Sequence, residues 1–206
     1  NFAISKELME ETTVTAERIV GSDDVGPSTI LNRDQIDAIA TINRSIADYV
    51  RLDPRVTINS ANSRSTEISV MGANNRFNDF MIDGISQNDP FGLNANGFGT
   101  MRNPIDMEFV DQISVDIAPF DTSRGNTSAG SILTVTKRGT NDYHGSVYYN
   151  SFTEANVGQD ANGNEFPEFE ETDMSGWISG PIVKDRLFFF AGYSSFESAE
   201  PALYGT

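Results

Sequence analysis

The sequence predicts an α+β fold, with a small mixed sheet and two or three short helices, followed by antiparallel strands near the C-terminus. Three observations support this prediction. A helix-capping pattern begins at Asn32, apolar and polar residues alternate through 110–117, and an aromatic run LFFFAGYSSF occupies 187–196. The first is typical of helices and the other two of strands.

The first helix is predicted to begin at Asn32. Gln35 follows three positions later, which is the spacing of an N-cap residue and its reciprocal partner. The apolar residues that then share one helical face are Ile36, Ile39 and Ala40.

A second helix is predicted to begin at Asn43 and to end by Leu52, because Asp53 precedes Pro54 and is pushed out of the α region. Its buried stripe is Ile46, Tyr49 and Val50. Three arginines lie near these helices, and we expect them on a solvated face, pairing with Asp48 rather than binding a ligand. They are Arg44, Arg51 and Arg55.

Short strands are predicted at 56–62 and 66–72 and around Phe80 and Ile82, where Asp83-Gly84 supplies a hairpin-type turn. A longer strand follows, and a polar loop at 121–131 connects it to a strand at 132–137. The apolar residues expected on its one buried face are Val110, Ile113, Val115 and Ile117. Gly125 and Gly130 in the loop allow positive φ angles.

The segment 87–102 is rich in glycine and contains apolar residues. A connection of this length without regular structure is more often functional or mobile than a simple link. Beyond residue 139, strands are predicted at 146–152, 176–182 and 187–196. Thr153–Met174 is expected to form a polar, acidic loop and Val183–Arg186 a charged turn.

The composition excludes several classes of function. With 14 Lys and Arg against 30 Asp and Glu, the net charge is −16, so nucleic acid is a poor partner. The acidity indicates either solubility or attraction of cationic cargo. There is no cysteine, which excludes thiolate chemistry. No apolar run reaches the ~20 residues of a spanning helix, and the N-terminus lacks the order of a secretory signal. We therefore expect a cytoplasmic chain or one whose signal has been removed.

No catalytic, metal or cofactor site is predicted, so we do not expect an enzyme. His144 is the sole histidine, and a single histidine cannot build a triad or a zinc site. The oxygens of Asp160, Asn162, Asn164 and Glu165 suit a hard cation, but the glycine spacing is not that of an EF-hand, and a solvated acidic loop is favoured. Paired carboxylates such as Asp79 and Asp83 are too common in an acidic chain to indicate a glycosidase.

Four segments carry a resemblance to a known family. SAGSILTVTKRG at 128–139 resembles the strand "GGVINIITK", and ISVMGANNRFNDFMIDGISQND at 68–89 resembles a "strand, Arg-Gly, spacer, strand, Asp-Gly" segment, with Met71 in place of the arginine. TNDYHGSVYYNSF and SGPIVKDRLFFFAGYSSFE resemble opening barrel strands. In this order they resemble the plug domain and first barrel strands of Oar-like TonB-dependent outer-membrane transporters.

The resemblance implies three parts: an N-terminal extension at 1–21, a plug domain at 22–140 and first strands of a transmembrane β-barrel at 141–206. It implies a plug that gates energy-coupled uptake or export of a substrate through a 22-stranded barrel in the outer membrane of a Gram-negative bacterium. The few strands encoded here cannot close a barrel, so we expect the chain to be part of a longer protein. The implied partners are TonB or a TonB-like protein, a substrate, lipid and the rest of the barrel.

The resemblance also assigns two candidate sites. The first matches the TonB box, whose extended backbone adds a strand to the sheet edge of TonB; an ordinary first plug strand is the other interpretation. Its residues are Thr12, Thr13, Val14, Thr15 and Ala16. The second is a substrate-facing loop, for which packing against the barrel wall is equally compatible. Its residues are Phe91, Leu93, Asn94, Asn96 and Phe98.

Two other classes of function are compatible with the sequence. The first is a secreted or surface binding module that recognises a partner or glycan through the Gly/Phe loop. The second is a secreted hydrolase that uses acidic residues.

Overall fold

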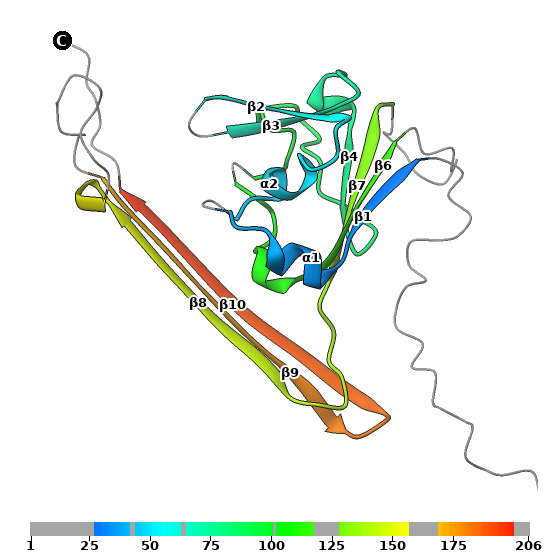
Figure 1. The fold of residues 1–206 in the computed structure, drawn as a ribbon, viewed down its shortest axis with the longest axis vertical. Coiled ribbons are helices and arrows are strands. Elements are labelled where there is room, and N and C mark those ends of the chain that lie inside the picture. Colours follow the sequence, from blue (N-terminus) through cyan, green and yellow to red (C-terminus); the bar gives the residue numbers. More distant parts are fainter. Residues whose placement is uncertain are drawn as a thin grey trace, which may run out of the picture.

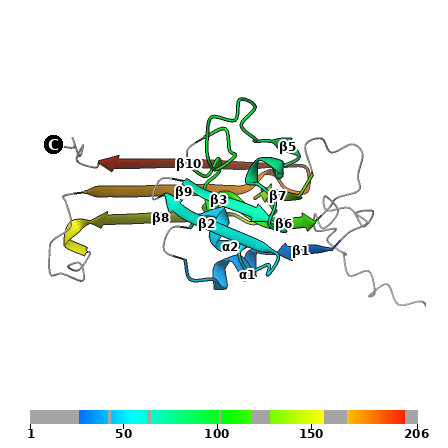
Figure 2. The same ribbon diagram turned by 90° about the horizontal axis from the view of Figure 1, so that it is seen from above.

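The computed structural model describes residues 27–41, 44–62, 65–100, 102–117, 128–156 and 169–199. These residues form two bodies, which we call the α+β domain (27–136) and the strand ribbon (β8–β10) (Figure 1). The ribbon runs diagonally past one side of the α+β domain. Seen from above, its three strands lie side by side beneath that domain (Figure 2).

The elements follow one another in a simple order. The helices are α1 (Arg33–Ala38) and α2 (Ile46–Val50), with 3₁₀ turns at Asn75–Phe77, Met107–Phe109 and Glu154–Asn156. The strands of the α+β domain are β1 (Ser28–Leu31), β2 (Val56–Asn62), β3 (Ser65–Val70), β4 (Asp79–Ile82), β5 (Ile85–Ser86), β6 (Val110–Ile117) and β7 (Gly130–Thr136). The ribbon contains β8 (His144–Thr153), β9 (Glu170–Val183) and β10 (Leu187–Ala199).

The sheet of the α+β domain has the order β1-β6-β7-β4-β5. Strand β4 pairs with β7 in parallel and the other neighbours are antiparallel, so the predicted mixed sheet is confirmed. Asp83 and Gly84 both have positive φ, at 49° and 83°, and join β4 to β5 as predicted. The β2–β3 hairpin forms a separate two-stranded sheet.

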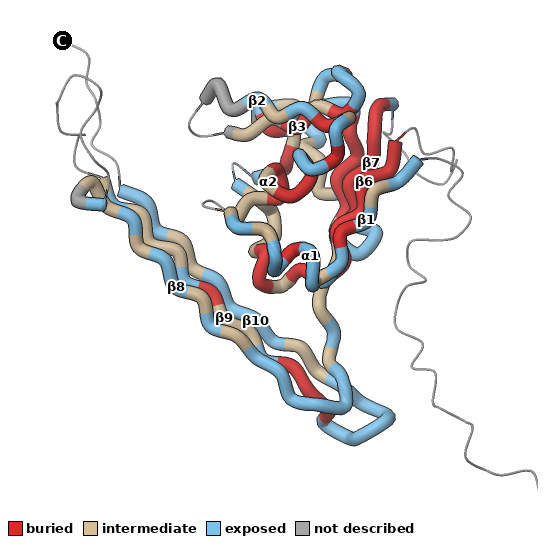
Figure 3. The backbone as a smooth tube through the Cα atoms, in the orientation of Figure 1, coloured by how far each residue is buried: buried red, intermediate tan, exposed pale blue. Residues whose placement is uncertain are grey.

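The core lies between the sheet and the elements that cover it. Helices α1 and α2 lie on the side of the sheet that is turned toward the ribbon (Figure 1). The largest fully buried side chains of this core include Ile36, Tyr49, Phe80, Ile113 and Ile132. A smaller cluster of Met81, Leu133 and Val135 forms a second core. Strands β6 and β7 are therefore buried along most of their length (Figure 3).

The capping pattern at the first helix is confirmed. The Asn32 side chain accepts from the Gln35 amide at 3.0 Å, and the Gln35 side chain accepts from the Asn32 amide at 3.0 Å. The predicted start of the second helix at Asn43 is wrong. Ser45 is the N-cap, and Arg44 before it has a φ of 45°, a left-handed conformation that no right-handed helix accommodates.

The predicted buried face of β6 is confirmed, with one addition. Val110 and Ile113 are three positions apart and share the core because a register shift between Val110 and Gln112 inserts a bulge. The opposite face is buried as well. Ser114 donates to the Asp116 carboxylate at 2.8 Å there, which satisfies polar groups that the alternation placed in solvent.

The role predicted for Gly130 is wrong. It is the first residue of β7 and is absent from the residues with positive φ. A Cβ atom on Gly130 would lie 2.7 Å from Val70 Cγ1, well inside contact distance. Glycine is therefore required here because β3 packs closely against the start of β7.

The ribbon strands are longer than predicted. β8, β9 and β10 contain 10, 14 and 13 residues, and β9 already begins at Glu170, so the predicted acidic loop does not extend to Met174. The acidic residues at its start therefore lie within β9 rather than in a loop, and successive residues of this strand face opposite sides of the ribbon. The turn at Val183–Arg186 is confirmed, with the Arg186 amide bonded to the Val183 carbonyl at 3.1 Å. Within the described ranges, no helix has the length and apolar character of a membrane span.

Candidate functional site

The two faces of the ribbon carry different side chains. Large apolar side chains alternate along one face and remain exposed on this chain: Val147, Tyr149, Met174, Ile178, Ile182 and Tyr193. Residues of the opposite face include Tyr148, Asp173, Ser175, Trp177 and Phe196, and they are turned toward the α+β domain. Apolar-out and polar-in alternation of this kind is typical of strands in a membrane barrel.

Three cations, two from the α+β domain and Lys137 from the connection that follows it, each lie over an aromatic ring of a different ribbon strand. The Arg44 guanidinium carbon is 4.6 Å from the centroid of Tyr148 on β8. Lys137 Nζ is 4.0 Å from the centroid of Trp177 on β9. The Arg102 guanidinium carbon is 3.1 Å from the ring centroid of Phe196 on β10. We call these three pairs the cation–π seam. Each pair is attractive because the ring face is electronegative.

Sequence reasoning missed the seam. Its partners are far apart in the chain, and the only available signal was the placement of aromatic residues at alternate, inward positions of the ribbon strands. Tyr148 and its neighbour Tyr149 lie on opposite faces of β8, and Tyr148 faces the α+β domain.

Lys137 lies in the connection between β7 and β8, and its amide donates to the Phe109 carbonyl at 2.8 Å. Burial lowers the pKa of Lys137 to about 8, and Arg33 adds to this effect. Three acidic side chains, of Glu108, Asp37 and Asp111, oppose it. Burial in the same way lowers the pKa of Arg102.

The ring of Phe109 fits against a glycine of the ribbon. A Cβ atom on Gly192 would lie 2.7 Å from Phe109 Cε1, so only glycine lets the ring approach β10 this closely. The ring also makes an edge contact with Phe190, with centroids 6.0 Å apart, and Phe190 in turn stacks on Trp177 at 5.8 Å. An aromatic cluster thus continues from the α+β domain into the ribbon.

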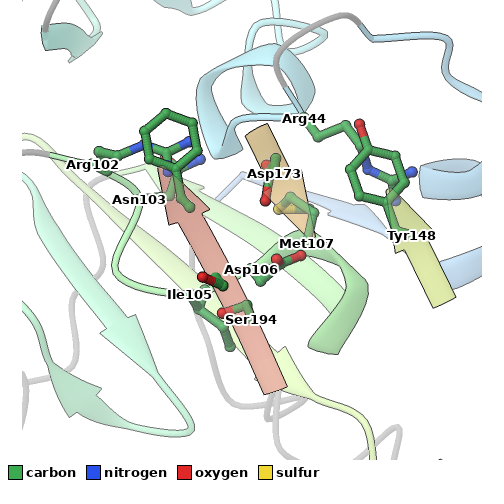
Figure 4. A pocket seen from close by; sticks show the side chains of 11 residues that line it. Arg44, Arg102, Asn103, Ile105, Asp106, Met107, Tyr148, Asp173 and Ser194 are labelled. Carbon is green, nitrogen blue, oxygen red and sulfur yellow. The ribbon is translucent and has the colours of Figure 1, made fainter. Parts of the chain in front are cut away.

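A polar cavity of about 100 Å³ lies beside the seam, between the two bodies (Figure 4). Its charged lining groups are Arg44, Arg102, Asp106 and Asp173, and hydroxyls of Tyr148 and Ser194 join them. Mixed charges and hydroxyls favour water in this space. Contact between the two bodies therefore combines aromatic packing with a cavity that has a polar lining.

Of the three arginines expected on a solvated face, one behaves as predicted. Arg51 pairs with Asp48 at 3.7 Å, three positions earlier in the chain. Arg44 precedes the N-cap of α2 and so lies outside the helix, and it pairs instead with the buried Glu108 at 2.5 Å. Arg55 pairs with Asp53, so the predictions for Arg44 and Arg55 are wrong.

Asp53 is buried at 1% exposure. Two nitrogens of the Arg55 guanidinium bond its carboxylate at 2.9 and 2.7 Å, and the Arg55 amide bonds it at 2.9 Å. These bonds, together with one from Thr29, hold the pKa of Asp53 well below its ordinary value. The carboxylate is therefore charged in the folded domain.

The five residues predicted for the substrate-facing loop differ in how far they are exposed. Phe91 and Leu93 are 82% and 83% exposed. Asn94 and Asn96 donate to the carbonyls of Phe98 and Thr100 at 2.9 and 3.0 Å, and hold the loop together. Phe98 is buried against Phe80, with centroids 4.8 Å apart. Phe91 and Leu93 are thus the exposed apolar side chains of this loop, whereas Phe98 belongs to the core.

The remaining candidate residues of the sequence lie away from the seam or outside the described residues. The TonB-box-like segment, Thr12 to Ala16, lies outside the described residues, as do Asp160, Asn162, Asn164 and Glu165. His144 is the first residue of β8. Among the residues that the structure describes, no group of three or more His, Asp or Glu side chains is placed to hold a metal.

A folded domain seated on the inward face of membrane-type strands defines a class of protein, the outer-membrane barrels that are filled by a plug. Comparison with family models agrees: residues 22–132 match the TonB-dependent Receptor Plug Domain and residues 135–205 match an Outer membrane beta barrel domain. The chain belongs to the TonB-dependent receptor family, and the α+β domain is its plug.

Relatives and solved structures are consistent with this assignment. The chain is 29% identical to the TonB-dependent transporter Oar of Myxococcus xanthus, over 93% of this chain and 19% of that protein. It is 30% identical to a probable TonB-dependent siderophore receptor, PirA of Acinetobacter baumannii, over 92% of this chain and 25% of that protein. The outer membrane transporter YddB from Escherichia coli has the same fold over 83% of this chain and 26% of its own, with a TM-score of 0.62 and 18% identity.

The chain thus spans about a fifth to a quarter of the length of the curated relatives it matches. The relatives named above are transporters and receptors rather than enzymes. The domain boundaries at residues 21 and 140 stay predictions.

Proposed function

We propose that this chain is the plug and the opening wall strands of a transporter that moves cargo across the outer membrane through a 22-stranded barrel. The observation that carries the proposal is the cation–π seam. Each of the three wall strands holds the plug, or the connection that leaves it at Lys137, through one aromatic ring on the face opposite the exposed apolar side chains. A domain anchored in this way to the inner wall closes the passage.

In this proposal TonB, or a TonB-like protein, supplies the energy by pulling on Thr12–Ala16. An extended peptide of this kind pairs its backbone with the edge of a partner sheet, and that pairing transmits tension without a deep pocket. Pulling on a segment that precedes β1 loosens the plug, and the polar lining of the cavity beside the seam supports separation of plug and wall at that place, because water can enter there.

TonB engagement is tested by binding of the purified C-terminal domain of TonB to the complete transporter. Val14→Pro removes the amide that strand addition requires and should abolish binding, whereas Val14→Ile should bind like the wild type. Equal binding of the proline variant would contradict the assignment of Thr12–Ala16.

Cargo contact is assigned to Phe91 and Leu93, because they are apolar and exposed. Ferric siderophores are the first probes to use, since one relative bears the name of a siderophore receptor. We expect Phe91→Ser with Leu93→Ser to reduce uptake of the accepted probe at least tenfold. A double variant that takes up the probe at the wild-type rate would contradict this assignment.

A further inference from the structure

Strand β1 is a short strand at the edge of the plug sheet. It contains four residues and, among the strands that the structure describes, lies at the sheet edge and pairs with β6 alone. Leu31 is its single buried side chain, whereas Ile30 is 44% exposed. β1 is also the described strand nearest the N-terminus, so tension applied at that end reaches it before any other described strand.

A charged clasp fastens β1 to the rest of the plug. The Thr29 hydroxyl donates to Asp53 Oδ2 at 2.7 Å and accepts from Arg55 Nη2 at 3.2 Å. Asp53 and Arg55 lie at the turn between α2 and β2, so the clasp joins β1 to elements outside its own sheet. We call Thr29, Asp53 and Arg55 the clasp.

The clasp can open without leaving a buried charge unpaired. If Thr29 withdraws, the Asp53 carboxylate still accepts three N–H bonds from Arg55. An unpaired buried carboxylate would strongly oppose opening. Because the ion pair stays closed, opening breaks the bonds of the hydroxyl and the β1–β6 ladder and exposes Leu31, but it leaves no charge unpaired.

The next element along the chain is held more firmly. Arg33 donates to the carbonyls of Met107 and Val110 at 3.1 and 2.9 Å. It also pairs with Asp37, and Ile36 is 1% exposed in the core. Detachment that begins at Ser28 therefore meets a barrier at α1.

We propose that β1 is a strap that detaches from β6 when the chain before it is pulled, and that the clasp sets the threshold for this step. The proposal rests on the function proposed above, in which tension enters at the N-terminus. Detachment would free the edge of β6, a central strand of the plug, while α1 keeps its place.

The strap is tested by hydrogen exchange in the complete transporter, followed by mass spectrometry in the absence of TonB. Thr29→Val keeps the shape of the side chain and removes the hydroxyl. We expect at least tenfold faster exchange in the peptide that covers β1, with unchanged exchange in β4 and β7. Thr29→Ser retains the hydroxyl and should stay within threefold of the wild type. Thr57→Val, on the exposed side of β2, is the matched control and should have no effect.

Two results would overturn the strap. Unchanged exchange of β1 in Thr29→Val would show that the clasp sets no threshold. Equal acceleration of β1, β4 and β7 would show that β1 does not open as a separate unit. TonB takes no part in this measurement, so failure of the Val14→Pro binding experiment leaves its outcome intact.

Tension itself is applied in a second experiment, by single-molecule pulling from an N-terminal handle on the membrane-embedded protein. The first rupture force should be lower for Thr29→Val than for Thr29→Ser and the wild type. Equal first rupture forces for all three proteins would contradict the proposal.

Discussion

The Arg102 guanidinium lies directly over the ring of Phe196, 3.1 Å from its centroid, and links the plug to the third wall strand. Burial lowers the pKa of Arg102, whereas the charges of Asp173, Glu171 and Asp106 act in the opposite direction. The ring face therefore holds a cation that has lost much of its water.

Phe196→Leu keeps an apolar side chain but removes the electronegative ring face. A desolvated cation–π pair contributes about 1–2 kcal/mol, so we expect release of the plug at a urea concentration lower by about 0.5–1 M. The readout is the reaction of a cysteine at Ser175, a fully buried wall position, with a water-soluble thiol reagent. Phe188→Leu, on the same strand and outside the cation–π pairs, is the control. Equal shifts in both variants would contradict a role for the seam.

Gly192→Ala tests the fit of Phe109 against the wall. The added methyl group would lie 2.7 Å from the Phe109 ring, and overpacking of this kind costs about 1–3 kcal/mol. The urea concentration at which the plug is released should therefore fall in Gly192→Ala. Adding Phe109→Leu to this variant should raise that concentration part of the way back toward the wild-type value. Gly176→Ala has its nearest neighbour at 3.5 Å and should change little. If Gly192→Ala behaved like Gly176→Ala, the contact would not hold the plug.

The lowered pKa of Lys137 predicts a pH dependence of plug seating. In the seated plug the pKa of Lys137 is about 8, whereas the ordinary pKa of an exposed lysine is 10.5. Between these values the released plug binds more protons, so seating becomes more favourable as the pH rises from about 8 to about 10.5. Below pH 8 this contribution is constant. The urea midpoint of wild type minus that of Lys137→Met should follow this course, and a flat difference would contradict it.

Because Phe98 is buried whereas Phe91 and Leu93 are exposed, substitutions in this loop should differ in their effect on stability. Phe98→Ala removes a buried ring and should lower the free energy of unfolding of the plug by about 3–5 kcal/mol. Phe91→Ser and Leu93→Ser alter exposed positions and should stay within about 0.5 kcal/mol of the wild type. Urea unfolding of the plug in the complete transporter measures all three. A large loss in Phe91→Ser would mean that the ring supports the fold.

Local signals in the sequence predicted much of the fold. The cap at Asn32 depends on a residue three positions away, and the turn at Asp83-Gly84 on two adjacent ones, so both could be predicted. Gly130 was misassigned because a glycine in a polar stretch resembles a turn residue, whereas its requirement comes from Val70 on another strand. Close packing between distant elements leaves no local pattern.

The site was less predictable for the same reason. Arg44 was expected to pair within its helix, but its partners Glu108 and Tyr148 come from a later turn and from the wall. The acidic start of β9 resembled a loop because charged residues are rare in soluble strands. On a wall strand, however, polar residues such as Asp173 face the plug. The family resemblance predicted the two bodies, and the structure was needed to locate the contacts between them.

The central claim is that this domain closes a barrel of which β8, β9 and β10 are wall strands. The most direct test is the permeability of proteoliposomes that contain the complete transporter, compared with a variant in which a short Gly-Ser linker replaces residues 27–136. We predict that the intact protein retains a small hydrophilic dye and that the variant releases it. Release by the intact protein, or retention by the variant, would contradict the claim.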